Sequence, residues 1–198
     1  FLTYFQNTML QMRDSKLPVI AAPVGMSIGG GFEVVLHADH VVSHANSVMG
    51  LVESFVGVVP AGGGCKEMLY RWTEKLNDTQ KGAWKSFMNI GLGRKANSPQ
   101  EADALAMRRA DDVFQMNRDR ILNIALSKLD DTKKASQRSP LALSGAEHFK
   151  EMLEWLEVNN KKGMLTPHDV TVGTEIGRIM SGGDCPAGTV FSEQEILD

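Results

Sequence analysis

Positive charge is missing from most of the first third of the chain. No lysine or arginine lies between Lys16 and Lys66, and the charged residues in that stretch are only Glu33, Asp39 and Glu53. A carboxylate there has no basic residue near it in sequence, so burial should raise its pKa. A carboxyl group with a raised pKa can donate a proton near neutral pH. The charge-poor stretch is therefore a candidate for acid–base chemistry.

Cysteine is scarce, and long apolar runs are missing. Cys65 and Cys185 form neither a CxxC pair nor part of a ligand cluster, which predicts two unreactive thiols in a reducing compartment. No apolar run reaches the roughly 18 residues of a membrane span, and no signal peptide is visible. We therefore expect a cytoplasmic protein without a transmembrane segment.

The chain also lacks a strong charge of either sign. Lysine and arginine together number 21 and aspartate and glutamate 24, so the formal net charge is −3. This mildly acidic balance argues against nucleic-acid binding, which favours a basic face. With 198 residues, 42 % of them hydrophobic, the chain is long enough for one large domain, or for one domain with an appendage.

The sequence at both ends predicts that the chain is a fragment of a longer polypeptide. The chain starts at Phe1 instead of methionine, already inside a predicted helix, and a capping-box sequence at Ser192 opens a helix that ends at Asp198. The alternative is a short processed protein with frayed ends.

A metal site is not expected. Three of the five histidines, His37, His40 and His44, cluster in HADHVVSH. Histidine ligands four residues apart need a helix to share one face, with a third ligand nearby. His40 and His44 have that spacing, but the residues around them predict a strand and a loop.

The order of apolar patterns predicts an α/β chain in which strands alternate with helices early and helices dominate late. We place a first region at 1–115 and a helical C-terminal region at 116–198. Helices are expected over 1–14, 32–39, 65–72, 73–90, 101–110, 117–131, 144–160 and 167–181. Strands are expected over 18–24 and 111–115 and twice within 40–50, and residues 25–31 should form a glycine-rich turn.

The sequence GMSIGGG, which joins a predicted strand to a predicted helix, carries the strongest chemical signal. Such a turn offers free backbone N–H groups and the positive end of a helix dipole. It has neither the GxGxxG spacing of a dinucleotide site nor the GK[ST] of a P-loop. Glu33 follows Gly30 by three residues, and Glu53 comes twenty residues later. Two carboxylates and a donor-rich turn predict acid–base chemistry on a polarised carbonyl.

Simpler interpretations of the same residues stay open. Glu33 could serve the helix dipole, and Glu53 could cap a turn. Asp39 is expected to form structural hydrogen bonds, and the glycines at 62–64 to shape a tight turn before a helix, with a minor role in a pocket. Phe5, Met9 and Met12, which share one face of the first helix with Phe1, are expected in the core and not in contact with a ligand.

Residues 16–64, KLPVIAAPVGMSIGGGFEVVLHADHVVSHANSVMGLVESFVGVVPAGGG, resemble without a gap the core signature of the crotonase superfamily, the enoyl-CoA hydratase/isomerase family. The resemblance implies a partial crotonase-like (ClpP/crotonase) α/β core of repeated β-β-α units with a helical C-terminal region. A Clp-type serine peptidase, which has a related fold, lacks support because Glu33 stands at the helix start and no serine lies beside a suitable histidine and aspartate.

The resemblance also implies roles for individual residues. Gly30 matches the glycine whose N–H binds the thioester oxygen. Glu33 and Glu53 match the two glutamates that hold the attacking water, the first activating it and the second delivering a proton to the α-carbon. The substrate is a CoA thioester, no cofactor is bound by this part of the chain, and no metal is used. Substrate contacts are expected from Met26, Gly29, Gly30, Val52, Val56 and Gly62.

The rest of the chain, through NKKGMLTPHDVTVGTEIGRIMSGGD, resembles the hydratase part of bacterial multifunctional fatty-acid oxidation proteins. In these, an NAD-dependent 3-hydroxyacyl-CoA dehydrogenase part lies elsewhere in the chain, and relatives form homo-oligomers. The implied function is hydration of 2-enoyl-CoA to 3-hydroxyacyl-CoA in β-oxidation. The alternatives are a Δ3-Δ2-enoyl-CoA isomerase, which often manages with one glutamate, and a non-catalytic assembly module.

Three departures from the family pattern stand out. Val52 replaces a proline that usually precedes the second glutamate, and Ala61 replaces a common glycine. The second oxyanion donor of the family lies in an upstream AGAD-like segment that these 198 residues do not include.

Overall fold

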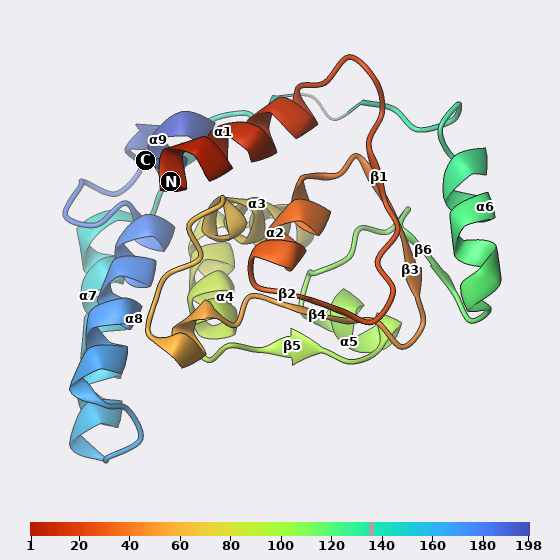
Figure 1. Ribbon diagram of the computed structural model, residues 1–198. Helices are drawn as coiled ribbons and strands as arrows, with labels where there is room; N and C mark the ends of the chain where they lie inside the picture. Colours follow the sequence, from red (N-terminus) through yellow and green to blue (C-terminus); the bar gives the residue numbers. More distant parts are fainter. Residues whose placement is uncertain (135–136) are drawn as a thin grey trace. The chain divides into compact units, whose positions relative to one another are not determined.

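The computed structural model describes residues 1–134 and 137–198, and its contacts form two units (Figure 1). The first unit consists of Phe1–Leu51, Ala61–Gly64 and Lys95–Gln137, and the second of Val52–Pro60, Cys65–Arg94 and Arg138–Asp198. Each unit is discontinuous in sequence. Residues 116–137 group with the first unit, although the sequence-based division assigned them to the C-terminal region.

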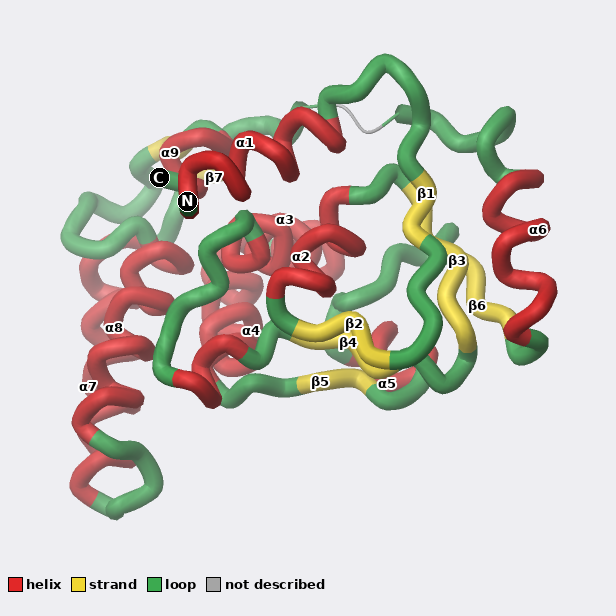
Figure 2. The backbone as a smooth tube through the Cα atoms, in the orientation of Figure 1, coloured by secondary structure: helices red, strands yellow, loops and turns green. Residues whose placement is uncertain are grey.

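Two small sheets form the framework of the first unit (Figure 2). One is parallel, in the order β1 (Ile20–Ala21), β3 (His40–His44) and β6 (Val113–Gln115), with Ile20 opposite His40 and Val42 opposite Val113. The other joins β2 (Met26–Ile28) to β4 (Val48–Gly50) in parallel, and β4 to β5 (Lys95–Ala96) in antiparallel pairing. The glycine-rich turn predicted over 25–31 is thus partly the strand β2.

Helix α2 (Gly30–His37) follows β2 directly and positions the candidate site. Gly29 precedes it with φ +56°, a left-handed conformation that a residue with a side chain adopts only at a cost. The sequence of α2 is apolar nearly all round, which is typical of a buried helix. Phe32 and Leu36 are fully buried, and Glu33 is only 2 % exposed. The predicted helix at 32–39 is therefore confirmed, with its start at Gly30.

The remaining helices of the first unit are α1 (Leu2–Arg13), α5 (Pro99–Ala104), the 3-10 turn η2 (Arg118–Arg120) and α6 (Ile121–Ser127). Ile121 and Ala125 of α6 pack on Val42 of β3. Asp39 accepts hydrogen bonds from Val19 N (2.7 Å) and Lys134 Nζ (2.8 Å), which confirms its structural role. Helix α5 is shorter than expected because Ala106, with φ +54°, leaves the helical conformation.

Helices dominate the second unit: α3 (Gly64–Leu76), α4 (Thr79–Gly91), α7 (Gly145–Lys161), α8 (Pro167–Ser181) and α9 (Glu193–Leu197). A short 3-10 helix, η1 (Glu53–Val56), and an antiparallel strand pair, β7 (Leu141–Ala142) with β8 (Val190–Phe191), complete it. Helices α7 and α8 lie side by side (Figure 1). Asp78 caps α4 by accepting from Lys81 N, so α3 and α4 are separate helices divided at 77–78 instead of at residue 73.

A buried ion cluster ties three segments of the second unit together. Lys66 Nζ donates to Glu67 Oε1 (2.7 Å) and to Glu193 Oε1 (2.6 Å), and all three side chains are at most 4 % exposed. Arg138 Nη2 donates to the other oxygen of Glu67 (3.2 Å). Buried charges persist only when they are paired in this way. The cluster therefore holds the C-terminal helix α9 against the start of α3.

Within the residues that the structure describes, no helix is both long and apolar enough to cross a membrane.

Candidate active site

Glu33 is held by the backbone of the glycine triplet. Its Oε1 accepts hydrogen bonds from Gly62 N and Gly64 N, both at 2.8 Å. Two N–H groups that converge on one oxygen fix the orientation of the carboxyl group. Three residues matched separately in sequence are thus brought together in the first unit: Glu33, Gly62 and, at the start of the same helix, Gly30.

The absence of side chains on the triplet makes this contact possible. A Cβ atom on Gly62 would lie 2.6 Å from Glu33 Oε2, and one on Gly64 would lie 2.9 Å from Glu33 Oε1. Neither distance leaves room for a methyl group. The triplet therefore does more than turn the chain: two of its N–H groups bind the Glu33 carboxylate, and its lack of side chains leaves room for that carboxylate. We call this arrangement the seat of Glu33.

Gly30 is the first residue of α2, directly after the left-handed Gly29. The first N–H groups of a helix have no partner within the helix and lie at the positive end of its dipole. The N–H of Gly30 is therefore available in principle to an oxygen that gains negative charge. Met26 lies in the adjoining strand β2 and is 76 % exposed.

Glu53 begins η1 in the second unit, and Val52 precedes it as the N-terminal cap. Glu53 Oε2 is buried without a hydrogen-bond partner among the described residues. Burial raises the pKa of Glu53 above its ordinary value, while hydrogen bonds from the backbone of Glu53 and Val52 oppose the rise. A carboxyl group in such surroundings is a candidate proton donor. The raised pKa that the sequence predicted for buried carboxylates between Lys16 and Lys66 is thus found at Glu53.

The second unit also contains an apolar cavity of about 270 Å³ beside η1. Ser54 and Phe55, the two residues after Glu53, form part of its lining. Helices α4, α7 and α8 and the segment between α7 and α8 supply the rest, including Phe87, Gly91, Trp155, Met164 and Val172. Phe55 and Met164 are also 70 % and 71 % exposed. A cavity just below the usual 300–1,000 Å³ of ligand sites, with exposed apolar side chains in its lining, suits a small apolar group.

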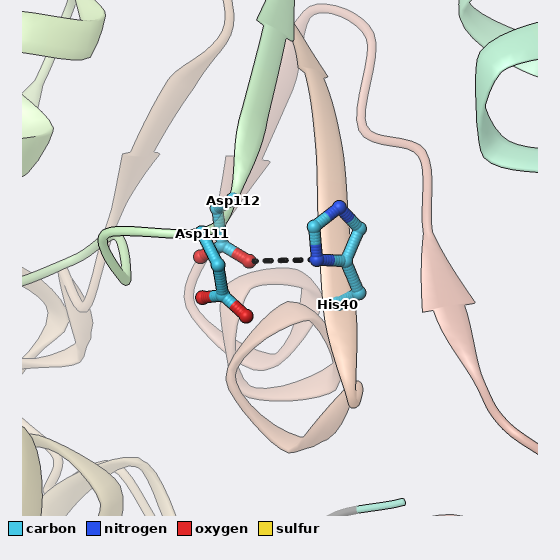
Figure 3. Close-up of side chains that lie close together, drawn as sticks. All are labelled: His40, Asp111 and Asp112. Atoms are coloured by element: carbon cyan, nitrogen blue, oxygen red, sulfur yellow. Dashed lines mark ion pairs between the residues drawn. The ribbon is translucent and has the colours of Figure 1, made fainter. Parts of the chain in front are cut away.

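One group of side chains in the described residues could in principle hold a metal ion: His40, Asp111 and Asp112 of the first unit (Figure 3). His40 Nδ1 lies 4.0 Å from Asp112 Oδ1. However, Asp112 Oδ1 already accepts from Val41 N (2.9 Å) and Oδ2 from Arg109 N (2.8 Å). Asp112 therefore acts as a structural link between β3 and the turn before β6. His40 and His44 both lie on β3, as the sequence predicted.

The comparisons with known proteins agree with this geometry. Residues 2–76 match the enoyl-CoA hydratase/isomerase family. Over 198 residues, the chain is 31 % identical to "Probable 3-hydroxyacyl-CoA dehydrogenase" of Bacillus subtilis (strain 168). This alignment covers 98 % of this chain and 25 % of that protein. Residues 2–76 belong to the crotonase superfamily. A second relative, "Putative fatty acid oxidation complex trifunctional enzyme" of Rickettsia felis, is 38 % identical over 66 residues, 33 % of this chain and 9 % of that protein.

Solved structures confirm the crotonase fold. An enoyl-CoA hydratase from Bacillus anthracis aligns with a TM-score of 0.54 at 18 % identity, covering 90 % of this chain and 59 % of that one. An enoyl-CoA hydratase from Thermoplasma volcanium GSS1 aligns with a TM-score of 0.51 at 20 % identity, covering 89 % and 60 %. The chain spans about a quarter of the Bacillus subtilis relative and about three-fifths of these two structures.

In this crotonase chain, the remaining predicted contact residues fall in two places. Gly29, Gly30, Gly62 and Met26 belong to the first unit, and Val52 and Val56 belong to the second. Val56 is 78 % exposed at the end of η1. Their contacts with a substrate stay predictions.

One residue near the crotonase site was not predicted from the sequence. Phe5 of α1 was expected in the core with Met9 and Met12; Met9 is buried and Met12 is half-buried. Phe5 instead lies against the glycines of the site: a Cβ on Gly30 would lie 3.5 Å from Phe5 Cζ. The helical spacing of Phe1, Phe5 and Met9 indicated an apolar face, but nothing in it showed what that face would contact.

Proposed function

We propose that this chain carries the hydratase site of a larger protein and adds water to 2-enoyl-CoA, giving 3-hydroxyacyl-CoA in fatty-acid β-oxidation. The observation that carries the proposal is the seat of Glu33, a buried carboxylate bonded to two backbone N–H groups beside the helix start at Gly30. The raised pKa of Glu53 supports a second, different role for that carboxyl group.

The proposed steps use the chain's own groups. The Gly30 N–H binds the thioester oxygen and withdraws electrons from the double bond. Glu33 takes a proton from water as the hydroxyl oxygen bonds to C3. Glu53 gives a proton to C2 as the enolate collapses, so the net reaction adds one water molecule. The protonated Glu33 and ionised Glu53 then exchange protons with solvent, which restores the starting state.

The apolar cavity beside η1 is evidence that the remainder of the acyl group is an alkyl chain. It begins at the residues that follow Glu53 and is lined mainly by apolar and aromatic side chains. A substrate with a longer alkyl chain gains about 0.8 kcal/mol of binding free energy for each additional CH₂ that it buries.

We further propose the context that the relatives' names suggest. Because the Bacillus subtilis relative is named as a 3-hydroxyacyl-CoA dehydrogenase and is about four times as long as the aligned region, the chain would be the covalent neighbour of an NAD-dependent dehydrogenase part. Cytoplasmic location and homo-oligomer formation belong to the same proposal. In that setting the product of hydration is the substrate of the neighbouring dehydrogenase part.

The test is hydration of crotonyl-CoA by the full-length protein, wild type beside Glu33→Gln, followed by loss of the enoyl absorbance. Removal of a general base should lower the rate by about 10²–10⁴-fold. Wild-type turnover with an unaffected Glu33→Gln variant would refute the assignment of Glu33. Absence of both turnover and acyl-CoA binding in the wild type would favour the non-catalytic assembly module.

A further inference from the structure

Phe5 differs from the other apolar residues at the start of α1. Phe1, Leu2 and Tyr4 are 101 %, 55 % and 77 % exposed, whereas Phe5 is half-buried. Helix α1 packs on α2 (Figure 1), and the helix has no side-chain cap at its N-terminus. The first turn of α1 is therefore attached to the first unit through Phe5 more than through its aromatic neighbours.

The ring of Phe5 occupies space that two glycines leave open. A Cβ on Gly62 would lie 2.2 Å from Phe5 Cε1 and 2.6 Å from Glu33 Oε2. A Cβ on Gly30 would lie 3.5 Å from Phe5 Cζ and 4.0 Å from Glu33 Oε2. The aromatic ring and the carboxylate thus share one small volume, bounded by the two glycines.

We propose that Phe5 is a positioning residue that covers Glu33 and holds it against the N–H groups of Gly62 and Gly64. An apolar ring at this point keeps bulk water away from the carboxylate, and a hydrogen bond to a charged acceptor is stronger where water is excluded. It also limits the rotamers open to Glu33. The covering role stands on geometry alone, and its effect on turnover rests on the proposed hydration.

The first test measures the cover without any substrate. In Phe5→Ala, water should reach Glu33, and the amide hydrogens of Gly62 and Gly64 should exchange with solvent at least tenfold faster, because their acceptor is less confined. Hydrogen exchange of the peptide that contains 61–64, measured on the full-length protein, reports this change. Tyr4→Ala is the matched control, since it removes an exposed aromatic ring from the same turn of the same helix.

The second test measures the effect on hydration. Loss of orientation at the reacting group should lower kcat of Phe5→Ala by about 10–100-fold, with less change in KM. Phe5→Leu keeps an apolar cover and should restore most of kcat and of the amide protection. Phe5→Val, a smaller truncation, should give intermediate values and serves if Phe5→Ala does not fold.

The outcomes are distinct. Faster exchange in Phe5→Ala but not in Tyr4→Ala supports the cover, even if the wild type hydrates no enoyl-CoA, in which case only the proposed function fails. Unchanged exchange at 61–64, or an equal increase in Tyr4→Ala, would overturn the cover. A normal kcat in Phe5→Ala beside an active wild type would overturn its effect on turnover.

Discussion

The segments that carry the two glutamates are built in opposite ways. Glu33 is almost completely buried, and two backbone N–H groups of its own unit hold one of its oxygens. Glu53 begins a short 3-10 helix, and one of its oxygens is buried without a partner among the described residues. One carboxyl group is seated by the backbone, and the other is left partly desolvated.

The difference teaches how one residue type can serve as base and as acid. N–H donors stabilise the charged form of a carboxylate, whereas desolvation stabilises the neutral form. The backbone donors fix the orientation of Glu33, as a group that takes a proton from a bound water requires, and the desolvation of Glu53 suits a group that donates a proton. The three predictions below test this contrast, beginning with the largest expected effect.

Glu53→Gln should lower hydration of crotonyl-CoA by about 10²–10⁴-fold, because the amide cannot deliver a proton to C2. Conversion of a 3-enoyl-CoA to the 2-enoyl isomer moves protons on carbon without fixing water, so one glutamate can suffice and the loss should be smaller. Parallel assays of both reactions measure the contrast. Glu147→Gln, at an exposed position of α7, is the control. Hydration at the wild-type rate in Glu53→Gln would show that Glu53 is not the acid.

Gly91→Leu should narrow the cavity beside Glu53. A Cβ at Gly91 meets nothing within 4 Å, so the leucine should enter the cavity without strain. Losing room for about two CH₂ groups should lower kcat/KM for 2-decenoyl-CoA by roughly tenfold, while crotonyl-CoA hydration stays unchanged. Gly91→Ala, which adds one methyl group, should have a smaller effect. An equal loss for both substrates would mean that the cavity does not hold the acyl chain.

The smallest expected effect is on stability. Because the pKa of Glu53 is raised in the folded protein, the folded state binds its proton more tightly than the unfolded state does. As the pH rises above the unfolded pKa, this preference becomes a cost, and the free energy of unfolding decreases. Glu53→Gln should therefore raise Tm at pH 8 and leave it nearly unchanged at pH 4.

In a chain of this size each kcal/mol corresponds to about 2–4 °C, so differential scanning calorimetry at the two pH values can resolve the gain. The same gain at both values, or a loss at pH 8 alone, would contradict the assignment of a raised pKa to Glu53.

Local signals in the sequence predicted much of this architecture. The helix expected over 167–181 is α8, which the Thr166–Asp169 capping box and Gly182 bound, and the glycines before Glu33 placed the start of α2 within two residues of Gly30. These features depend on residues a few positions apart. The hydrogen bonds to Glu33 join residues 29 and 31 positions apart. The family resemblance assigned Glu33 and Gly62 to one site but did not indicate these hydrogen bonds.

Other features depend on contacts that no local pattern specifies. The half-buried ring of Phe5 over Gly62 was not predicted, because helical periodicity indicates an apolar face without naming its partner. The cap of α4 at Asp78 did have a local signal, because residues 77–82 interrupt the apolar pattern and aspartate favours the N-cap position, and the predicted helix over 73–90 overlooked it. The division into two discontinuous units could not be predicted from the order of elements along the sequence. Each unit is made of three separate segments, and only the contacts between those segments define it.

The ion pair between Lys66 and Glu193 affects when the second unit can finish folding during synthesis of the chain. The two residues are 127 positions apart, and a ribosome adding about 5–20 residues per second needs roughly 6 to 25 seconds to travel between them. During that interval Lys66 lacks one of its two carboxylate partners, so the start of α3 cannot become fully buried at low cost. The second unit is therefore completed only after residue 193 has been made, and a chain that stops earlier leaves Lys66 without this partner.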